Sequence, residues 1–223
     1  MSTTERPADP ITFHSLRDGP GALRPGPAIV DTAAVHRGRL IVAMVDAVAA
    51  RGYAATTIAD VVALAKVSRR TFYEYFADKE ECFLAAYEVA SDLLLAAIAA
   101  AVDEEAPWED RLLAGIDAYL EGVAGEPAVS RVFLVEVLGA GPRALARRRD
   151  IISRFAAQLR EVVTIGTQDP GGVRVLSEEM SIAIVGAVNE LVLVKVEQDR
   201  IPDIPDLRHA AAVLVRGVVT EGA

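Results

Sequence analysis

Cysteine and histidine are scarce in this chain of 223 residues, which contains one cysteine and three histidines. Cys82 has no second cysteine for an internal disulfide, which suits a reducing compartment. His14, His36 and His209 are scattered, so no metal-ligand spacing emerges. A glycine-rich phosphate loop and a serine-nucleophile elbow are also missing. The sequence therefore predicts a protein that is not an enzyme and that holds no metal or cofactor.

Long hydrophobic runs are missing as well. The most apolar stretches, residues 93–102 and 182–188, are shorter than the ~20 residues that a membrane-spanning helix needs. The first residues lack the basic and apolar pattern of a signal peptide. Hydrophobic residues nevertheless make up 52% of the chain, enough for a core without staples. We therefore expect a cytoplasmic protein of buried helices, without a membrane partner.

Acidic residues outnumber basic ones, and the formal net charge is −9. The excess is confined to the later part of the chain. Residues 31–82 contain seven lysines and arginines against seven acids, whereas residues 83–223 contain 13 against 22. An acidic body limits non-specific attachment to phosphates. The neutral first part permits nucleic-acid binding, although a basic stripe would indicate it more strongly.

Helix signals dominate the pattern of apolar residues, and the expected fold is all-α. Residues 1–30 are rich in proline and glycine without apolar periodicity, which predicts a flexible N-terminal arm. The β-branched run at 162–165 favours a strand, but helix length and alanine content outweigh it. The expected helices span about 33–51, two short segments within 57–76, then 78–102, 108–122, 128–138, 142–166, 177–199 and 205–220.

The most informative stretch is residues 57–76, which predicts two short helices joined by a tight turn. Thr57, with Asp60 three residues later, has the spacing of a capping box. Ser68 provides a hydroxyl that can cap the second helix. The spacing matches a helix-turn-helix, in which the second helix offers its N-terminal residues to DNA base edges.

The second helix of this motif separates core side chains from candidate DNA contacts. Phe72 and Phe76 are four residues apart and are expected to face inward together. Arg69 and Arg70 lie where base contacts are made, and arginine can bind guanine with two hydrogen bonds. Lys79 has no capping role, so we favour a phosphate contact for it. The candidate DNA-binding residues are Thr57, Lys66, Ser68, Arg69, Arg70, Thr71, Tyr73, Tyr75 and Lys79. Capping is the alternative role for Thr57 and Ser68, and packing is the alternative for Thr71, Tyr73 and Tyr75.

Residues 37–90 resemble the N-terminal domain of the tetracycline-repressor (TetR) family of transcriptional regulators. The segments that carry the resemblance are residues 47–53, 56–60, 67–76 and 78–80. The family usually has glycine in the turn where this chain has Lys66. A non-glycine residue at positive φ is costly, so either the turn differs or Lys66 tolerates strain. The resemblance implies a three-helix DNA-binding head at residues 31–78 and a helical effector-binding and dimerisation body at 79–223.

The last two expected helices, at about 177–199 and 205–220, are apolar on nearly all sides. Such helices must be covered on both sides. In the family that the chain resembles, the last two helices of each subunit form a four-helix dimer interface, which implies a homodimer. A reader of a two-fold operator also needs two heads about one DNA turn, ~34 Å, apart. The alternative is that both helices belong to the core of one subunit.

The resemblance further implies a small-molecule pocket in the body, and the composition favours a largely apolar effector. The candidate ligand-binding residues are Trp108, Tyr119, Phe133, Glu136, Phe155 and Asn189, each of which is otherwise plain core or interface. A basic patch on one expected helix is interpreted as a solvated face; it comprises Arg143, Arg147, Arg148, Arg149 and Arg154. Glu190, within an apolar helix, needs a partner if it is buried.

These observations favour a homodimeric, ligand-responsive repressor that occupies a palindromic site in double-stranded DNA and is released by its effector. Two alternatives remain open at this point. The chain could be a helical small-molecule binding protein or enzyme with a remnant head, or an adaptor for protein partners. Cys82, at the start of a helix, leaves a redox sensor open, although an inert thiol is favoured.

Overall fold

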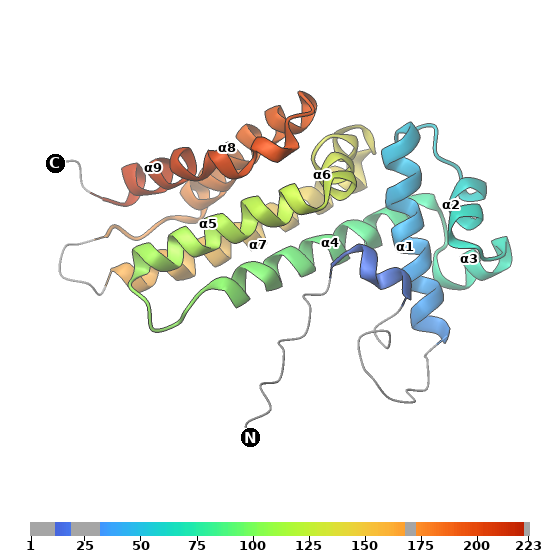
Figure 1. Ribbon diagram of the computed structural model, residues 1–223, viewed down its shortest axis with the longest axis horizontal. Helices are drawn as coiled ribbons and strands as arrows, with labels where there is room; N and C mark the ends of the chain where they lie inside the picture. Colours follow the sequence, from blue (N-terminus) through green and yellow to red (C-terminus); the bar gives the residue numbers. More distant parts are fainter. Residues whose placement is uncertain (1–11, 19–31, 168–172, 221–223) are drawn as a thin grey trace, which may run out of the picture.

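The chain folds into a helical head and a larger helical body (Figure 1). The computed structural model describes residues 12–18, 32–167 and 173–220. Helices α1 (Thr32–Arg51), α2 (Ile58–Ala65) and α3 (Arg69–Tyr75) form the head, and α4 (Lys79–Ala101) leads from it along the body.

The body is built from α4 and five further α-helices. These are α5 (Trp108–Gly125), α6 (Pro127–Leu134), α7 (Pro142–Gly166), α8 (Glu178–Glu197) and α9 (Arg208–Val219). Short 3-10 helices are η1 (His14–Asp18), η2 (Glu136–Gly139), η3 (Ile201–Asp203) and η4 (Pro205–Leu207). Within the described ranges the only β pairing is an isolated bridge between Val173 and Thr220. The all-α prediction is confirmed, and α7 has the predicted bounds.

Two helices that the sequence predicts as continuous are interrupted in the structure. The stretch expected at 128–138 is α6 followed by the 3-10 turn η2. The last expected helix begins as η4 and becomes α-helical only at Arg208. Pro205 occupies the first position of η4, where its fixed φ and missing N–H are tolerated.

The head has no core of its own. One continuous cluster of buried side chains joins α1, α2 and α3 to α4, α6 and α7. It contains Phe72 and Phe83, both with no exposed surface, and reaches Phe133 and Ile151 in the body. A displacement of α4 or α6 is therefore expected to shift the head, because closely packed side chains transmit strain.

The N-terminal arm is partly a docked segment. Phe13 is 3% exposed, and η1 packs against α1. Gly38 permits this approach, since a Cβ there would lie 2.4 Å from the carbonyl oxygen of Leu16. The expectation of a flexible arm at 1–30 is therefore wrong for residues 12–18, and its remainder lies outside the described residues. Two apolar side chains, Phe13 and Leu16, are too few to produce a detectable periodicity.

Helix α4 is long and apolar enough to cross a membrane by length and composition alone. In this structure it is a body helix that packs against α1, α5 and α7. Cys82, Phe83 and Ala86 on α4 are fully buried in the protein. Contacts within the chain thus account for the apolar side chains in the first half of α4, whereas Ala99 and Ala100 near its end are exposed.

Candidate nucleic-acid interface and effector cavity

The turn between α2 and α3 is held by local hydrogen bonds. Thr57 caps α2: its hydroxyl accepts from the Asp60 N–H at 3.3 Å, while the Asp60 carboxylate accepts from the Thr57 N–H at 2.9 Å. Lys66 ends α2 in the left-handed conformation, with φ 55° and ψ 44°. The sequence left two possibilities, a different turn or strain at Lys66. The structure shows the second, because Lys66 adopts the left-handed conformation that favours glycine.

Helix α3 is anchored from below by its apolar side. Phe72 and Phe76, with 0% and 3% exposure, are core residues as predicted. The Ser68 hydroxyl caps α3 by accepting from the Thr71 N–H at 3.0 Å. The opposite side of the helix is left to solvent, and Tyr73 is 58% exposed there. The burial of two rings thus fixes the orientation in which α3 presents its polar side chains.

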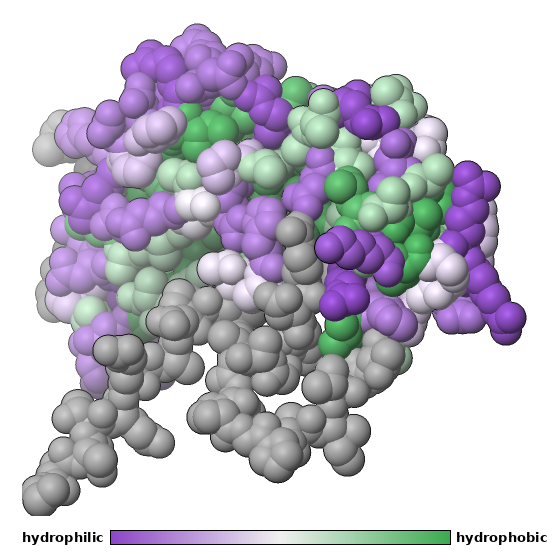
Figure 2. Space-filling view, turned by 45° about the vertical axis from the view of Figure 1, so that its right-hand side comes forward, coloured by the Kyte–Doolittle hydropathy of each residue, from purple (hydrophilic) through white to green (hydrophobic). Residues whose placement is uncertain are grey.

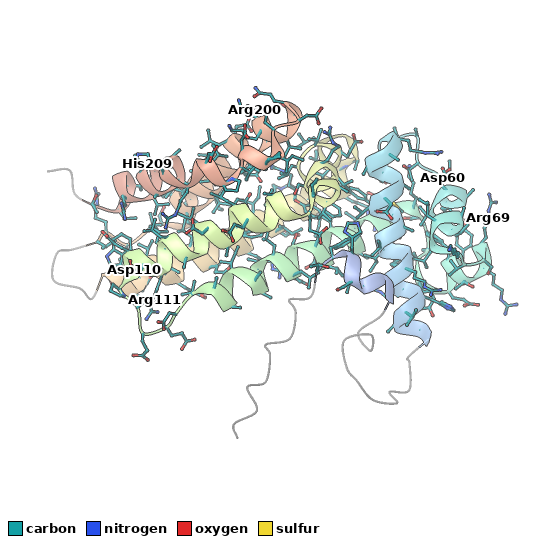
Figure 3. The ribbon with its side chains drawn as sticks, viewed as in Figure 1. Asp60, Arg69, Asp110, Arg111, Arg200 and His209 are labelled. Carbon is teal, nitrogen blue, oxygen red and sulfur yellow. The ribbon has the colours of Figure 1, made fainter. Side chains whose placement is uncertain are left out.

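The nine candidate DNA-binding residues all lie on the head or at its junction with α4. Six of them are exposed, namely Thr57, Lys66, Ser68, Arg69, Arg70 and Tyr73, while Thr71, Tyr75 and Lys79 are half-buried. Among the described residues, the polar partner of Arg70 is Glu74, one helical turn away at a long distance of 3.4 Å. Figure 3 shows Arg69 at the end of the molecule remote from the body. In Figure 2 hydrophilic side chains follow the outer edge of this head.

Lys79 differs from the expectation. Its Nζ donates to the carbonyl oxygens of Tyr53 at 2.8 Å and Thr56 at 3.0 Å, and lies 4.2 Å from the centre of the Tyr53 ring. The premise that Lys79 has no structural role is therefore wrong. The contact joins residues 23 to 26 positions apart, which helix-capping rules do not reveal. A phosphate contact of Lys79 stays a prediction.

A cavity of about 320 Å³ lies within the body and is lined by α4, α5, α6, α7 and α8. Thr12 and Phe13 of the docked N-terminal segment complete its wall. A smaller cavity of about 120 Å³ shares Tyr119, Phe155 and Val185 with it and is almost entirely apolar. Volumes and linings of this kind fit a small, largely hydrophobic molecule.

Comparison with known proteins decides the family of the head. Residues 40–86 match the profile described as bacterial regulatory proteins, tetR family. Residues 40–86 therefore form a DNA-binding helix-turn-helix head of the kind found in the tetR family of bacterial regulatory proteins. No curated protein sequence matches the chain.

Solved structures resemble this chain over the head and body together. The fatty acid degradation regulator FadR from Bacillus halodurans superposes with a TM-score of 0.74 at 18% identity, covering 89% of this chain and 100% of that one. FadR from Bacillus subtilis, solved with stearoyl-CoA, gives 0.70 at 20% identity, covering 81% and 98%. A tetR-family protein from Rhodococcus RHA1 gives 0.65 at 22%, covering 81% and 96%. At these identities the likeness establishes a shared fold.

Four of the six candidate ligand-binding residues line the larger cavity of the body: Tyr119, Phe133, Phe155 and Asn189. Trp108 lines neither cavity, because its ring is packed against Gly166 at the far end of α7. Glu136 is also elsewhere, since its carboxylate accepts a hydrogen bond from the Tyr53 N–H at 2.8 Å. The expectation that these two residues line the pocket is wrong.

Several residues of the cavity were missed from the sequence. Tyr87 and Arg148 line it, as does Glu126, whose carboxylate lies 2.6 Å from Nδ1 of His14. Arg148 had been assigned to a solvated basic patch. Arg148 and Phe155 are seven residues apart, which places both on one side of α7. This spacing was the signal available in the sequence.

The basic patch is not simply solvated. Arg143 binds Glu80 at 2.9 Å, and Arg154 binds both Glu88 and Asp92 on α4, at 2.9 and 2.5 Å. Arg147 also pairs with Glu88. Three of its five arginines therefore tie α7 to α4, and the interpretation as a solvated face is wrong for these three.

Cys82 has no exposed surface, and its Sγ lies 3.8 Å from the Leu40 carbonyl oxygen. Burial raises the pKa of this thiol well above its usual range. A neutral, enclosed thiol is a poor nucleophile, so the structure favours the inert thiol. Within the described residues no group of histidine, cysteine and acidic side chains has a metal-binding arrangement.

Proposed function

We propose that this protein is a cytoplasmic, homodimeric repressor that occupies a palindromic operator and is released by a small apolar effector. The observation that carries the proposal is the construction of α3. Two buried rings, Phe72 and Phe76, hold the helix, while Arg69, Arg70 and Tyr73 stand exposed on its other side. Exposed arginine on a fixed recognition helix supports reading of the major groove.

Stripes of exposed small and apolar residues on α8 and on α9 support the homodimer. On α8 the exposed small and apolar residues recur at intervals of three and four, and on α9 they do so again. They are Met180, Ala183, Ala187, Leu191 and Val194 on α8, and Ala210, Val213 and Gly217 on α9. Such a stripe is the seam of a helix pair that packs against a second helix pair. Glu190 is exposed in the single subunit, so its carboxylate does not need a partner there.

The cavity supports a largely apolar effector. FadR from Bacillus subtilis, which shares the fold, is described in complex with stearoyl-CoA. The cavity of this chain opens among α4 to α8, between the head and the proposed dimer face. An effector there is well placed to change the relation between the two heads of a dimer.

A chain of aromatic contacts leads from the cavity to the head. Phe133, which lines the cavity, lies 5.6 Å from Phe83 between ring centres, and Phe83 lies 4.7 Å from Tyr53 in the head. We infer two arrangements of these packed elements, of which the effector binds the DNA-incompetent one more tightly. By linkage, the effector then lowers operator affinity by the same factor by which DNA lowers effector affinity.

The proposal is tested by selecting bound fragments from the source genome with the purified protein and measuring affinity across salt concentration. We expect a two-fold symmetric site, bound with nanomolar affinity and a steep salt slope. Arg69→Ala and Tyr73→Ala should abolish operator binding without changing thermal stability. Arg149→Ala, an exposed arginine on α7, is the matched control. A folded, effector-free protein that enriches no sequence would contradict the proposal.

The homodimer is tested separately by sedimentation. Val213 is 52% exposed on the α9 stripe and Val175 is 74% exposed before α8, outside the stripe. Val213→Asp should shift the protein from dimer to monomer, because it introduces a charge into an apolar interface. Val175→Asp should leave the dimer intact. If both variants sediment as the unmodified protein does, the assigned dimer face is wrong.

A further inference from the structure

The larger cavity contains polar groups that the rest of the described chain leaves unused. Arg148, Tyr87 and Tyr119 all line it. The Arg148 guanidinium and both phenolic hydroxyls lack hydrogen-bond partners among the described residues, and the guanidinium has no carboxylate partner there. Asn189, on the α8 side of the cavity, likewise has an amide without a partner in the described part of the chain. These polar groups lie on the cavity wall and are available to form hydrogen bonds with a molecule bound there.

Arg148 differs from Arg147 and Arg154 of α7 in having no acidic partner among the described residues. Arg147 and Arg154, one position before and six after it, are both paired with Glu88 on α4. These two arginines belong to the α4–α7 contact. Arg148 is half-buried on another side of the helix and is directed to the cavity. It therefore supplies a positive charge to a wall that is otherwise largely apolar.

Other polar side chains of the wall are already satisfied. The hydroxyl of Ser91 donates to the Tyr87 carbonyl oxygen at 2.8 Å, and that of Ser130 donates to the Val123 carbonyl oxygen at 2.6 Å. Glu126 is engaged by His14. The cavity groups without partners among the described residues are thus a guanidinium, two phenols and an amide, each of which can donate a hydrogen bond.

The two phenols are neutral at physiological pH and donate their protons. Burial raises the pKa of Tyr87 to about 12, and burial raises the pKa of Tyr119 as well. Both hydroxyls are close enough to Arg148 for its charge to oppose that rise. Tyr87 is stacked on Phe133 at 4.7 Å and Tyr119 meets Phe155 edge-on at 5.9 Å, so each ring is held in place by a neighbour.

We propose that the cavity binds a free carboxylic acid with an apolar body, whose carboxylate is held by Arg148 together with the hydroxyls of Tyr119 and Tyr87. A carboxylate accepts several hydrogen bonds and matches the forked donors of arginine. The apolar tail then lies against the surrounding leucine, isoleucine and phenylalanine side chains. This inference rests on the proposed function only in treating the cavity as the effector site.

The same geometry argues against a coenzyme A thioester as the preferred ligand. A thioester has no carboxylate, and the phosphates of coenzyme A require several cations. Among the described residues that line the larger cavity, Arg148 is the one arginine or lysine. Arg148 can balance one negative charge on the ligand, and Glu126, the acidic residue described in the same wall, already lies 2.6 Å from His14.

The experiment is calorimetric titration of the full chain, without DNA, with decanoate, 1-decanol and decanoyl-CoA below their micellar concentrations. Decanoate and 1-decanol share the tail and differ at the head group. We expect decanoate to bind at least about tenfold more tightly than 1-decanol, since a charged hydrogen bond in such a site is worth that factor. Equal binding of the two, or tighter binding of decanoyl-CoA, would overturn the proposal.

Three variants locate the carboxylate. Arg148→Met should remove the preference for decanoate while leaving 1-decanol binding unchanged, which also shows that the cavity is intact. Tyr119→Phe should weaken decanoate several-fold and affect 1-decanol little. Arg149→Met, on the exposed side of α7, should bind as the unmodified protein does. If Arg148→Met binds neither ligand, Tyr119→Phe decides: an unchanged decanoate preference there overturns the assignment.

Failure of this inference and failure of the proposed function can be told apart. Operator selection is carried out without ligand, and titration without DNA. A protein that selects an operator but shows no decanoate preference keeps the repressor and loses the carboxylate site. A protein that prefers decanoate through Arg148 but selects no DNA keeps the site and loses the repressor.

Discussion

The carboxylate of Glu136 accepts a hydrogen bond from the backbone N–H of Tyr53 at 2.8 Å, joining η2 of the body to the loop between α1 and α2 of the head. Gly52, at φ 80°, makes room for it, since a Cβ there would lie 3.2 Å from the same oxygen. Two segments 83 positions apart are thereby locked together at the point where the head turns.

Removal of this acceptor should loosen the head. Glu136→Ala leaves a partly buried N–H without a partner, and we expect the free energy of unfolding to fall by about 1–3 kcal/mol. Glu136→Gln retains an oxygen acceptor and should recover most of the loss. Chemical denaturation measures both. Equal stability of the Ala variant and the unmodified protein would show that the contact does not hold the head.

We expect Lys79 to stabilise the folded head rather than to bind DNA. Lys79→Met retains the apolar stem but loses hydrogen bonds to two carbonyl groups, so the free energy of unfolding should fall by about 1–2 kcal/mol. A phosphate contact would also contribute about one unit to the salt slope of operator binding. Because the ammonium is turned toward the Tyr53 and Thr56 carbonyls, we expect the slope to be unchanged. A reduced slope would restore the phosphate contact.

Lys66 should tolerate glycine better than an ordinary helical position does. Its φ of 55° is in the left-handed region, where a side chain costs roughly 1–2 kcal/mol. Lys66→Gly relieves that cost but raises the conformational entropy of the unfolded chain, and the net change in the free energy of unfolding should be a gain of up to about 1 kcal/mol. Ala63→Gly, exposed inside α2, should instead cost about 0.5–1 kcal/mol. Equal losses in the two variants would argue against strain at Lys66.

Asp60 should make the stability of the head depend on pH. Hydrogen bonds from Thr57 lower the pKa of this carboxyl. A lowered pKa in the folded state stabilises the protein above the ordinary pKa of aspartate, and the contribution is lost as the pH falls through the folded value. Asp60→Asn should therefore destabilise the protein at neutral pH, with the difference closing in acid. A difference that is constant from neutral to acid pH would contradict this assignment.

Cys82 should report unfolding rather than oxidation state. Because burial raises the pKa of the thiol, it is protonated and enclosed at mildly alkaline pH. Labelling by a thiol reagent such as dithionitrobenzoate should be slow in the native protein and immediate in denaturant, with the native rate following the opening of the fold. Rapid labelling of the native protein would return the redox sensor to consideration.

Local chemistry made the head predictable. The interactions that define the motif join residues at most four positions apart. They are the capping box of Thr57 and Asp60, the Ser68 cap, and the paired rings of Phe72 and Phe76. Their geometry follows from helical periodicity, and the structure confirms each of them. The sequence by itself therefore determined the all-α class, the helix-turn-helix and which side of α3 is buried.

Tertiary packing decided the roles that depend on distant partners. Lys79 meets the Tyr53 and Thr56 carbonyls, Glu136 meets the Tyr53 N–H, and Phe13 closes a cavity formed by five helices. Arg148 differs from Arg147 only in the side of α7 on which it lies, toward the cavity rather than toward Glu88. No local propensity encodes which helix packs beside another. The joint between head and body and the charge within the cavity were therefore fixed only when the helices packed together.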